Sequence, residues 1–284
     1  MILKNFLQIE SVIWKNINKR EDAIVAEIVN AWNSFGVIDL NDIIINGINY
    51  SLWVKFHQFK THGKMININD IININNQLIG YKTEYGDIAI IVDYIIEDSL
   101  INRKISILQS KKEKRINQVE IDLHQLYLMH YWPNVTLSGQ NFNFRNIKSD
   151  DFSFYHFILN QTNDSNWCST ICSAQFVSMN IGINYVQLIN YLKEWLKRKN
   201  INSNTKPPSR TLKINLSPRS TPNNEWSLIP KPFRRKLKEI AYLFWGTSDQ
   251  RVIELSKLRI PNILRIDFVA GRSKSDWIEK SIDL

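Results

Sequence analysis

The chain has 284 residues, of which 44% are hydrophobic and 22% are charged, and these proportions are typical of a globular protein. Its net charge of +9 and pI near 9.4 favour acidic partners, of which nucleic acid is the most frequent. Two cysteines are too few for a disulfide framework or a four-thiolate zinc site. The sequence shows neither a signal peptide pattern nor an apolar run of about 18 residues. We therefore expect a cytoplasmic protein that does not contact a membrane.

A first helix is predicted over residues 22–35, with Asp22 as its N-cap and Gly36 as its C-terminal stop. Glu27 lies at the edge of the apolar stripe of this helix, where a carboxylate can reach a site at a sheet edge. A solvated surface glutamate is the alternative interpretation. The stripe consists of Ile24, Ile28, Ala31 and Phe35.

Residues 37–80 are expected to be rich in strands, because β-branched and aromatic residues are frequent there. The dipeptide Asn46-Gly47 is typical of a hairpin turn, and apolar and polar residues alternate over 48–57 as in a half-buried strand. The run 65–79 consists almost entirely of Ile and Asn, and it is compatible with either a strand or a loop.

Two apolar, β-branched runs in the middle of the chain flank a short polar break and predict a hairpin. The first run covers residues 88–96 and the second begins at residue 104, with the turn near 98–99. The numbers of paired residues then sum to roughly 196, so Asp87 comes opposite residue 109. Asp93 lies about 20 Å further along the first strand, near the turn, and we interpret it as a structural carboxylate.

The open end of this hairpin is predicted to gather three kinds of polar side chain. Gln109 and Lys111 are two residues apart in a strand, so they point to the same face, beside Asp87. Glu84, three residues before Asp87, can join them. Carboxylate and amide oxygens suit Mg²⁺ or Mn²⁺, and a lysine can orient the attacking water or stabilise the charge of a phosphorane. The pattern therefore indicates metal-assisted cleavage of a phosphodiester bond.

The residues Gly86-Asp87, the apolar strand, and Leu108-Gln109-Ser110-Lys111 resemble the core of the PD-(D/E)xK restriction-endonuclease-like superfamily. The Q-x-K variant of Mrr-like restriction nucleases is the most similar, and the resemblance covers about residues 20–133. It implies an α/β fold whose core is a mixed sheet flanked by helices, with a second, smaller α+β region. It also implies a glutamate on the preceding helix, which leaves Glu27 and Glu84 as alternatives for the additional acidic residue. Gln109 departs from the Glu or Asp of most members, and inactive relatives therefore remain an alternative.

Further along the chain, a basic cluster and a helix follow the hairpin. The helix is predicted over 117–130, and Gln125 on it resembles a glutamine that related nucleases place near the substrate. Residues 134–174 look irregular, 177–198 look helical, and the spacing of Cys168 and Cys172 would place them on one helix face. The residues expected to bind phosphates in and near the cluster are Lys112, Lys114 and Arg115.

The chain is divided on these grounds into four parts. Residues 1–135 are the nuclease-like core, and 136–200 are a helical and irregular extension. Residues 201–232 hold most of the prolines and are a basic linker or loop. Residues 233–284 are a C-terminal α+β segment, with helices at 234–245 and 275–282 and a strand at 263–269. In this part, Arg234, Arg235 and Lys236 are expected to contact nucleic acid.

The sequence thus predicts an Mg²⁺-dependent endonuclease acting on DNA, and the resemblance implies bacterial restriction or anti-phage defence. Asp87, Gln109 and Glu84 are the expected metal ligands, and Lys111 is expected to stabilise the transition state. A catalytically inactive nucleic-acid-binding relative and a protein-interaction module are the alternatives. The sequence leaves open DNA against RNA, cleavage specificity, a homodimer, and a gating partner protein or trigger.

Overall fold

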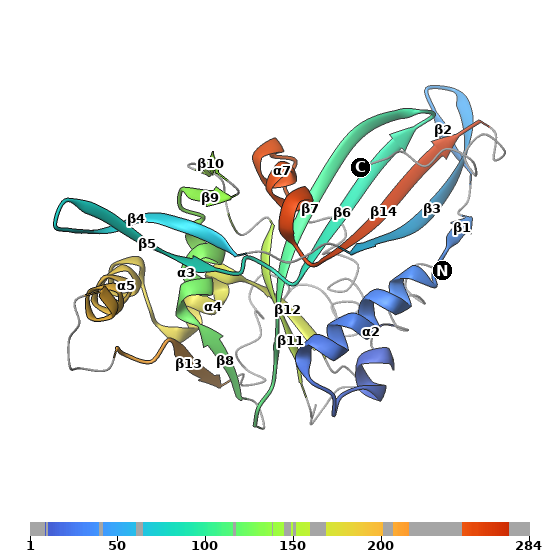
Figure 1. Cartoon of the computed structure of the whole chain (residues 1–284). Coiled ribbons are helices and arrows are strands. Elements are labelled where there is room, and N and C mark those ends of the chain that lie inside the picture. The colour runs from blue at the N-terminus through green and yellow to red at the C-terminus, as the bar shows by residue number, and fades with distance from the viewer. Residues whose placement is uncertain are drawn as a thin grey trace.

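In the computed structural model, the chain forms a mixed α/β fold in which a large sheet is accompanied by smaller antiparallel sheets (Figure 1). None of the helices in the described part of the chain is long and apolar enough to cross a membrane. The structure describes residues 9, 11–39, 42–60, 65–115, 118–137, 139–144, 149, 152–159, 169–200, 207–215 and 246–272.

The large sheet is mixed, and its strands come from both ends of the described chain. They are β1 (Val37–Asp39), β2 (Ile43–Ile45), β3 (Ile48–Lys60), β6 (Ile88–Ile96), β7 (Ser99–Lys112), β11 (Ser153–Ile158), β12 (Ser169–Ser173) and β14 (Asn262–Gly271). Their order is β1-β3-β14-β6-β7-β11-β12, and β2 pairs with β3 beside this path. The pairs β7–β11 and β6–β14 are parallel, whereas the other neighbours along the path are antiparallel.

The remaining elements lie around this sheet. The smaller sheets contain β4 (Ile66–Ile74), β5 (Gln77–Thr83), β9 (Val135–Leu137) and β10 (Gln140–Phe142), and separately β8 (Gln118–Asp122) with β13 (Thr211–Asn215). The helices with stated bounds are α2 (Glu21–Asn33), α3 (Leu123–Tyr131), α4 (Ala174–Ile181), α5 (Tyr185–Asn200) and α7 (Gln250–Arg259). Figure 1 shows α2 along one side of the large sheet, whereas α3, α4 and α5 gather with the smaller sheets on the other side.

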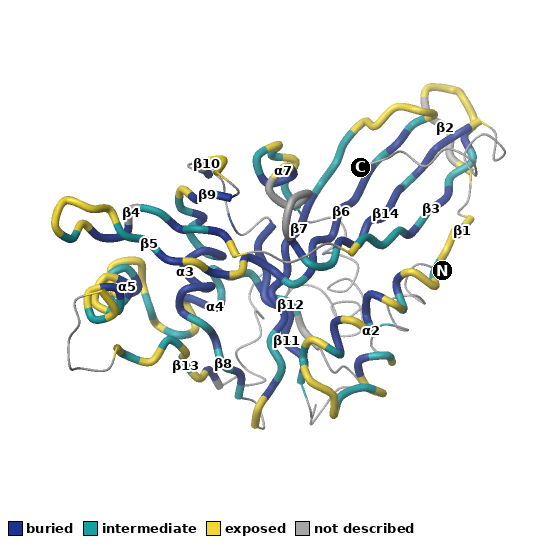
Figure 2. The backbone as a smooth tube through the Cα atoms, viewed as in Figure 1, coloured by how far each residue is buried: buried dark blue, intermediate teal, exposed yellow. Residues whose placement is uncertain are grey.

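The large sheet is buried on both faces in its middle part (Figure 2). In β6, Ile88 and Ile90 pack in a cluster with Val25 and Val29 of α2, whereas Ala89 and Ile91 belong to the cluster that includes α3. This arrangement explains why β6 is a continuous apolar run instead of an alternating one.

The predicted hairpin is confirmed, including its register. Ile88 is the partner of Leu108 and Asp93 is the partner of Arg103, so the paired numbers sum as expected up to an irregularity after Tyr94. The turn at Asn46-Gly47 is also confirmed, since both residues have positive φ. The undecided run 65–79 forms most of the β4–β5 hairpin.

The position of β14 corrects the predicted division of the chain. Residues 262–271 form a strand, as predicted, but this strand lies between β3 and β6 in the large sheet and not in a separate segment. The core sheet therefore cannot end at residue 135. The predicted helices at 234–245 and 275–282 lie outside the described residues.

Local predictions after the hairpin are partly wrong. The helix expected from residue 117 begins at Leu123, because 118–122 form β8 and pair with β13. The carboxylate of Asp122 then caps α3 by accepting hydrogen bonds from backbone N–H groups of its first turn. The helix expected over 177–198 is interrupted at Gly182, where the backbone has positive φ.

The segment 134–174 is more regular than expected. It contains β9, β10, β11 and β12, of which β11 and β12 extend the large sheet. Cys172 lies in β12, so its predicted place on a helix face is wrong, and Cys168 lies outside the described residues. These strands are too short for a clear alternation of polar and apolar residues in the sequence. Their formation depends on pairing with neighbouring strands of the sheet.

A buried ionic network crosses four neighbouring strands at the end of the sheet near the β6–β7 turn. Arg103 donates two hydrogen bonds of 2.6 Å to the carboxylate of Asp93, which is fully buried. Arg265 lies with its Nε 3.0 Å from Asp93 and 2.6 Å from Asp267. His57 lies 2.9 Å from the second oxygen of Asp267. The network therefore connects β7, β6, β14 and β3, in agreement with the structural role predicted for Asp93.

We expect Arg265→Ala to lower the free energy of unfolding by roughly 3 kcal/mol, because it removes a cation that contacts two buried carboxylates. Urea unfolding measures the change. Arg272→Ala is the control, since the Arg272–Glu97 pair at the end of β14 is exposed and should contribute at most about 1 kcal/mol. Equal losses in the two variants would contradict a stabilising role of the network.

Candidate active site

The carboxylate of Asp87 is held at the open end of the β6–β7 hairpin. The backbone N–H of Asp87 donates to the carbonyl oxygen of Leu108 over 2.9 Å, and this bond continues the strand pairing by one residue. Oδ2 of Asp87 accepts a hydrogen bond of 2.5 Å from Nε2 of Gln109 and one of 2.7 Å from the backbone N–H of Ser110. The structure therefore brings Asp87 and Gln109 together.

The glycine before Asp87 is required by close packing. A Cβ atom at Gly86 would lie 2.6 Å from Cγ2 of Ile107, which is closer than such atoms approach one another. Ile107 is fully buried on the neighbouring strand and has no room to move away. The Gly-Asp dipeptide thus allows the chain to reach the strand and the carboxylate to meet β7.

The environment of Asp87 disfavours its charged form. The pKa of Asp87 is raised to about 7, chiefly by burial of the carboxyl group and to a smaller extent by the nearby carboxylates of Glu21 and Glu84. The ammonium group of Lys111 and the hydrogen bond from the backbone of Ser110 act in the opposite direction. Strongly shifted carboxyl groups of this kind are frequent at functional sites.

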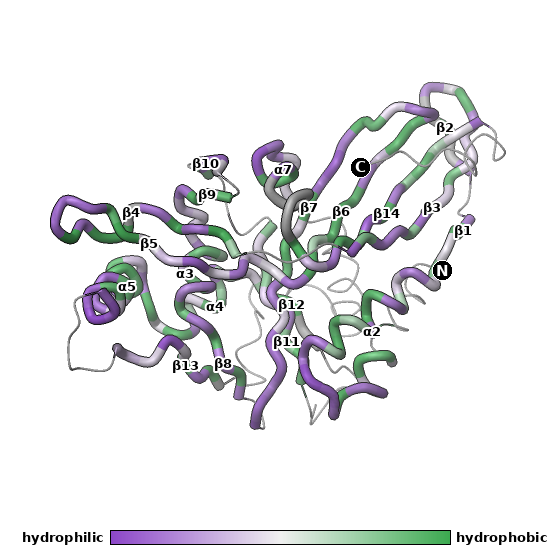
Figure 3. The backbone as a smooth tube through the Cα atoms, viewed as in Figure 1, coloured by the Kyte–Doolittle hydropathy of each residue, from purple (hydrophilic) through white to green (hydrophobic). Residues whose placement is uncertain are grey.

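Lys111 follows Gln109 by two residues on β7, and its charge is close enough to affect Asp87. Figure 3 shows that a mainly hydrophobic stretch of β7, residues 105–108, separates two hydrophilic stretches of the strand. The stretch 102–104 includes Arg103 of the ionic network, and the stretch 109–112, at the end of the strand, belongs to the candidate site. Lys111 is partly exposed, so its ammonium group can meet a ligand from solvent.

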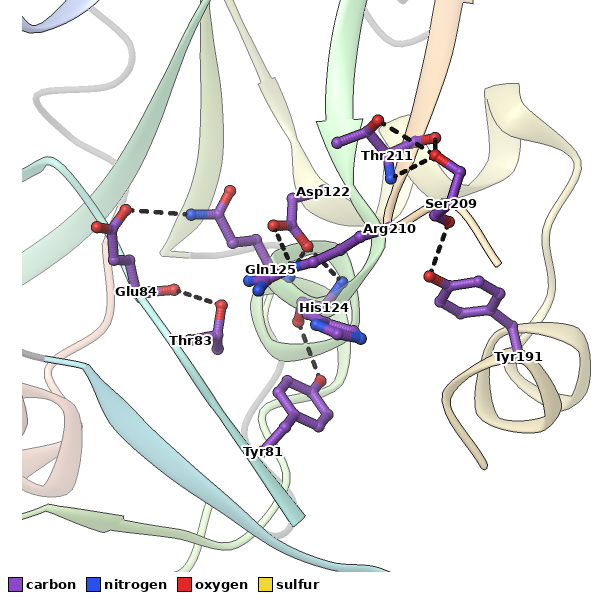
Figure 4. Close-up of polar contacts among 10 residues, drawn as sticks. All are labelled: Tyr81, Thr83, Glu84, Asp122, His124, Gln125, Tyr191, Ser209, Arg210 and Thr211. Carbon is purple, nitrogen blue, oxygen red and sulfur yellow. Dashed lines mark hydrogen bonds and ion pairs between the residues drawn. The ribbon is translucent and has the colours of Figure 1, made fainter. Parts of the chain in front are cut away.

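Glu84 and Gln125 meet at the edge of the site (Figure 4). Nε2 of Gln125, on the first turn of α3, lies 3.5 Å from Oε2 of Glu84, which is a long contact. Oε1 of Gln125 is buried and has no hydrogen-bond partner among the described residues. The next residue back, His124, stacks on Tyr81, and burial lowers its pKa to about 4, so it is neutral and part of the core.

Glu21, on the first turn of α2, is a site residue that the sequence analysis missed. Its Oε2 accepts a hydrogen bond of 2.6 Å from the backbone N–H of Lys112, and its charge raises the pKa of Asp87. Glu27 lies about 9 Å further along the helix axis and forms an ion pair of 2.9 Å with Lys19. The sequence signal that could have identified Glu21 is the pair of acidic residues in the first turn of α2. We expected Asp22 to be the N-cap, but α2 already begins at Glu21.

The oxygen atoms around Asp87 fit a magnesium ion of the kind that keeps several water ligands. No group of three or more His, Cys, Asp and Glu side chains in the described ranges is arranged to hold a metal. Mg²⁺, however, is commonly bound by one or two carboxylates together with water and substrate phosphates. Oε1 of Gln109 is buried without a hydrogen-bond partner among the described residues, and a cation would satisfy it. Asp87, Gln109 and Glu84 or Glu21 would supply the protein ligands.

The residues expected to bind phosphates differ in their contacts within the protein. The ammonium group of Lys112 donates to the backbone oxygen of Lys19 over 2.6 Å, and Lys114 forms an ion pair with Glu120. Arg115 is exposed and forms an isolated bridge with Gln118, the first residue of β8. The residues Arg234, Arg235 and Lys236 lie outside the described part of the chain.

We expect Asp87→Asn to stabilise the protein at pH 8 in the absence of divalent cations. The pKa of this carboxyl group is raised on folding, so the native state loses stability as the pH rises from about 4 to about 7. The advantage of the variant should grow over this range to roughly 4 kcal/mol and then stay constant. Urea unfolding at several pH values tests this, with Asp42→Asn, which replaces an exposed carboxylate, as the control. A constant difference between Asp87→Asn and wild type would contradict the raised pKa.

Comparisons of this chain with protein-family models, with curated proteins and with solved structures found no match. The interpretation of the site therefore depends on its own residues and their geometry. These are a carboxylate held by an amide and a backbone N–H, a lysine two residues further along the same strand, and two further carboxylates nearby.

Proposed function

We propose that this protein is an Mg²⁺-dependent endonuclease that hydrolyses phosphodiester bonds of DNA, with a Q-x-K site of the restriction-endonuclease-like type. The observation that carries the proposal is the 2.5 Å hydrogen bond between Gln109 and Asp87, with Lys111 next along the same face of β7. The net charge of +9 supports a nucleic acid as the substrate. By resemblance, its setting is bacterial restriction or anti-phage defence.

The order of the elements around the site supports this proposal. The acidic first turn of α2 and the hairpin β6–β7 both contribute to the site, and α3 follows the hairpin. β11 then returns parallel to β7, with Tyr155 as the register partner of Gln109. This order gives a mixed sheet flanked by helices, which is the arrangement that the resemblance to a restriction-endonuclease-like core implies.

Each residue of the site has a role in the proposed reaction. Bound Mg²⁺ would polarise the phosphate and lower the pKa of an attacking water. Gln109 holds Asp87 through Nε2 and presents Oε1 as a neutral ligand atom. Lys111 places a positive charge where the phosphorane becomes more negative than the substrate, and this difference accelerates hydrolysis.

The second candidate function is binding of nucleic acid without cleavage. The amide of Gln109 is a weaker metal ligand than a carboxylate, and three carboxylates do not converge on one point within the described residues. Titration of the protein with Mn²⁺ distinguishes the two functions. If the protein is a nuclease, the wild type binds Mn²⁺ and Asp87→Ala does not. If it is an inactive relative, the wild type and Asp87→Ala do not differ in Mn²⁺ binding.

Lys111→Ala should reduce cleavage of supercoiled and linear DNA on the order of a hundredfold, because it removes a charge that stabilises the transition state. The loss in Asp87→Ala should be at least as large, since this variant also weakens metal binding. Rates are measured with Mg²⁺ or Mn²⁺ at matched concentrations of folded protein.

Lys112→Ala is the matched control for Lys111→Ala. Lys112 is the next residue on β7, but its side chain points to the opposite face and contacts Lys19. Its loss should therefore reduce cleavage much less. Equal cleavage by wild type and Lys111→Ala would reject the assignment of Lys111.

Removing the charges of Arg234, Arg235 and Lys236 should weaken DNA binding by a similar factor for all sequences. Contacts with phosphates carry no sequence information, and each lost contact should reduce the salt dependence by roughly one unit of log-log slope. Binding is measured at several salt concentrations in the Lys111→Ala background, where cleavage of DNA is expected to be slow. If the salt dependence of DNA binding is unchanged, these residues do not contact DNA.

A further inference from the structure

The beginning of β14 contacts the backbone of Asp87 directly. Nδ2 of Asn262 donates a hydrogen bond of 3.0 Å to the carbonyl oxygen of Asp87. Asn262 is the register partner of Ile88, so its side chain reaches one residue beyond the paired part of β6. Ile260, two residues earlier, is fully buried, and its Cδ1 would lie 3.8 Å from a Cβ atom at Gly86. The C-terminal part of the chain thus contacts Asp87 and lies beside Gly86.

We propose that Asn262 is a positioning residue for Asp87, so that docking of β14 is required for a competent active site. This inference rests on the proposed nuclease function. Asn262 contacts neither metal nor DNA in this assignment, and it acts through the backbone of Asp87. Asn262 is not part of the motif, which consists of Gly86-Asp87 and Gln109-Ser110-Lys111.

The argument for positioning comes from the way in which the peptide groups of Asp87 are held. On one side, its N–H donates to Leu108 of β7 over 2.9 Å. On the other side, its carbonyl oxygen accepts from Asn262 of β14. The backbone is therefore fixed between two strands, and the direction of the side chain follows from it. Loss of the second contact removes the restraint on the carbonyl oxygen of Asp87 and lets the carboxylate move away from Ser110.

A second polar contact between the hairpin and the C-terminal part provides a matched control. Oγ of Ser248 donates to Oδ1 of Asn102 over 2.9 Å, near the other end of β7. Asn102→Ala therefore also removes a side-chain contact between these two parts of the chain. The contact that Asn102→Ala removes is far from Asp87 along the hairpin. A general loss of stability from weaker docking of the C-terminal part would therefore appear in both variants, whereas an effect on Asp87 would not.

The experiment compares wild type, Asn262→Ala, Asn262→Ser and Asn102→Ala by NMR and by kinetics. The amide protons of Ser110 and Lys112 both donate to carboxylates, namely those of Asp87 and Glu21. In Asn262→Ala, we expect the Ser110 proton to move upfield while the Lys112 proton stays in place. We also expect kcat for DNA cleavage to fall by roughly 3- to 10-fold with KM unchanged, as for loss of one hydrogen bond.

Asn262→Ser keeps a shorter donor and should recover part of both effects, and Asn102→Ala should show neither. An unchanged Ser110 proton in Asn262→Ala, or an equal change in Asn102→Ala, overturns the proposal. If the alanine variant does not fold, the serine variant decides by the same comparison of Ser110 with Lys112. If the wild type neither cleaves DNA nor binds Mn²⁺, the proposed function fails, whereas the NMR comparison still decides whether Asn262 positions Asp87.

Discussion

The pairing of β6 with β7 is the constraint on which the structure depends. Because Ile88 is the partner of Leu108, Asp87 meets Gln109 at one end of the hairpin and Asp93 meets Arg103 at the other. A slip of one residue would turn every side chain of one strand to the opposite face and disrupt both ends together. The stability of the sheet and the geometry of the candidate site are thus consequences of one register.

The two ends of the hairpin differ in their balance of charge. Around Asp93, two arginines and two carboxylates compensate one another in a region that water hardly reaches. Around Asp87, the negative potential of two further carboxylates is opposed chiefly by one lysine. The excess of negative charge lies at the accessible end, and this is the end where a cation and a phosphate can approach from solvent.

The sequence was sufficient to predict interactions between neighbouring parts of the chain. The hairpin, its register and the meeting of Asp87 with Gln109 follow from strand period and turn position. Glu21 was missed because periodicity predicts which helix face is buried but not how far the helix is displaced along the sheet. β8 was mistaken for helix because Val119 falls at helical spacing from Leu123, Leu126 and Tyr127 of α3, and the strand that pairs with β8, β13, is distant in sequence. The position of β14 in the sheet could not be predicted from nearby residues, because the strands that it pairs with, β3 and β6, are distant in sequence.

The central place of β14 has a consequence for biosynthesis. Asp87 and Asn262 are 175 residues apart in sequence, so a ribosome must synthesise most of the described chain before these two residues can meet. At about 5–20 residues per second, this takes roughly 10–35 s. During that time β3 and β6 lack the strand that separates them, and the nascent sheet has two open edges that can pair wrongly. A chaperone that shields these edges would therefore raise the yield of folded protein more than it would for a sheet that closes in chain order.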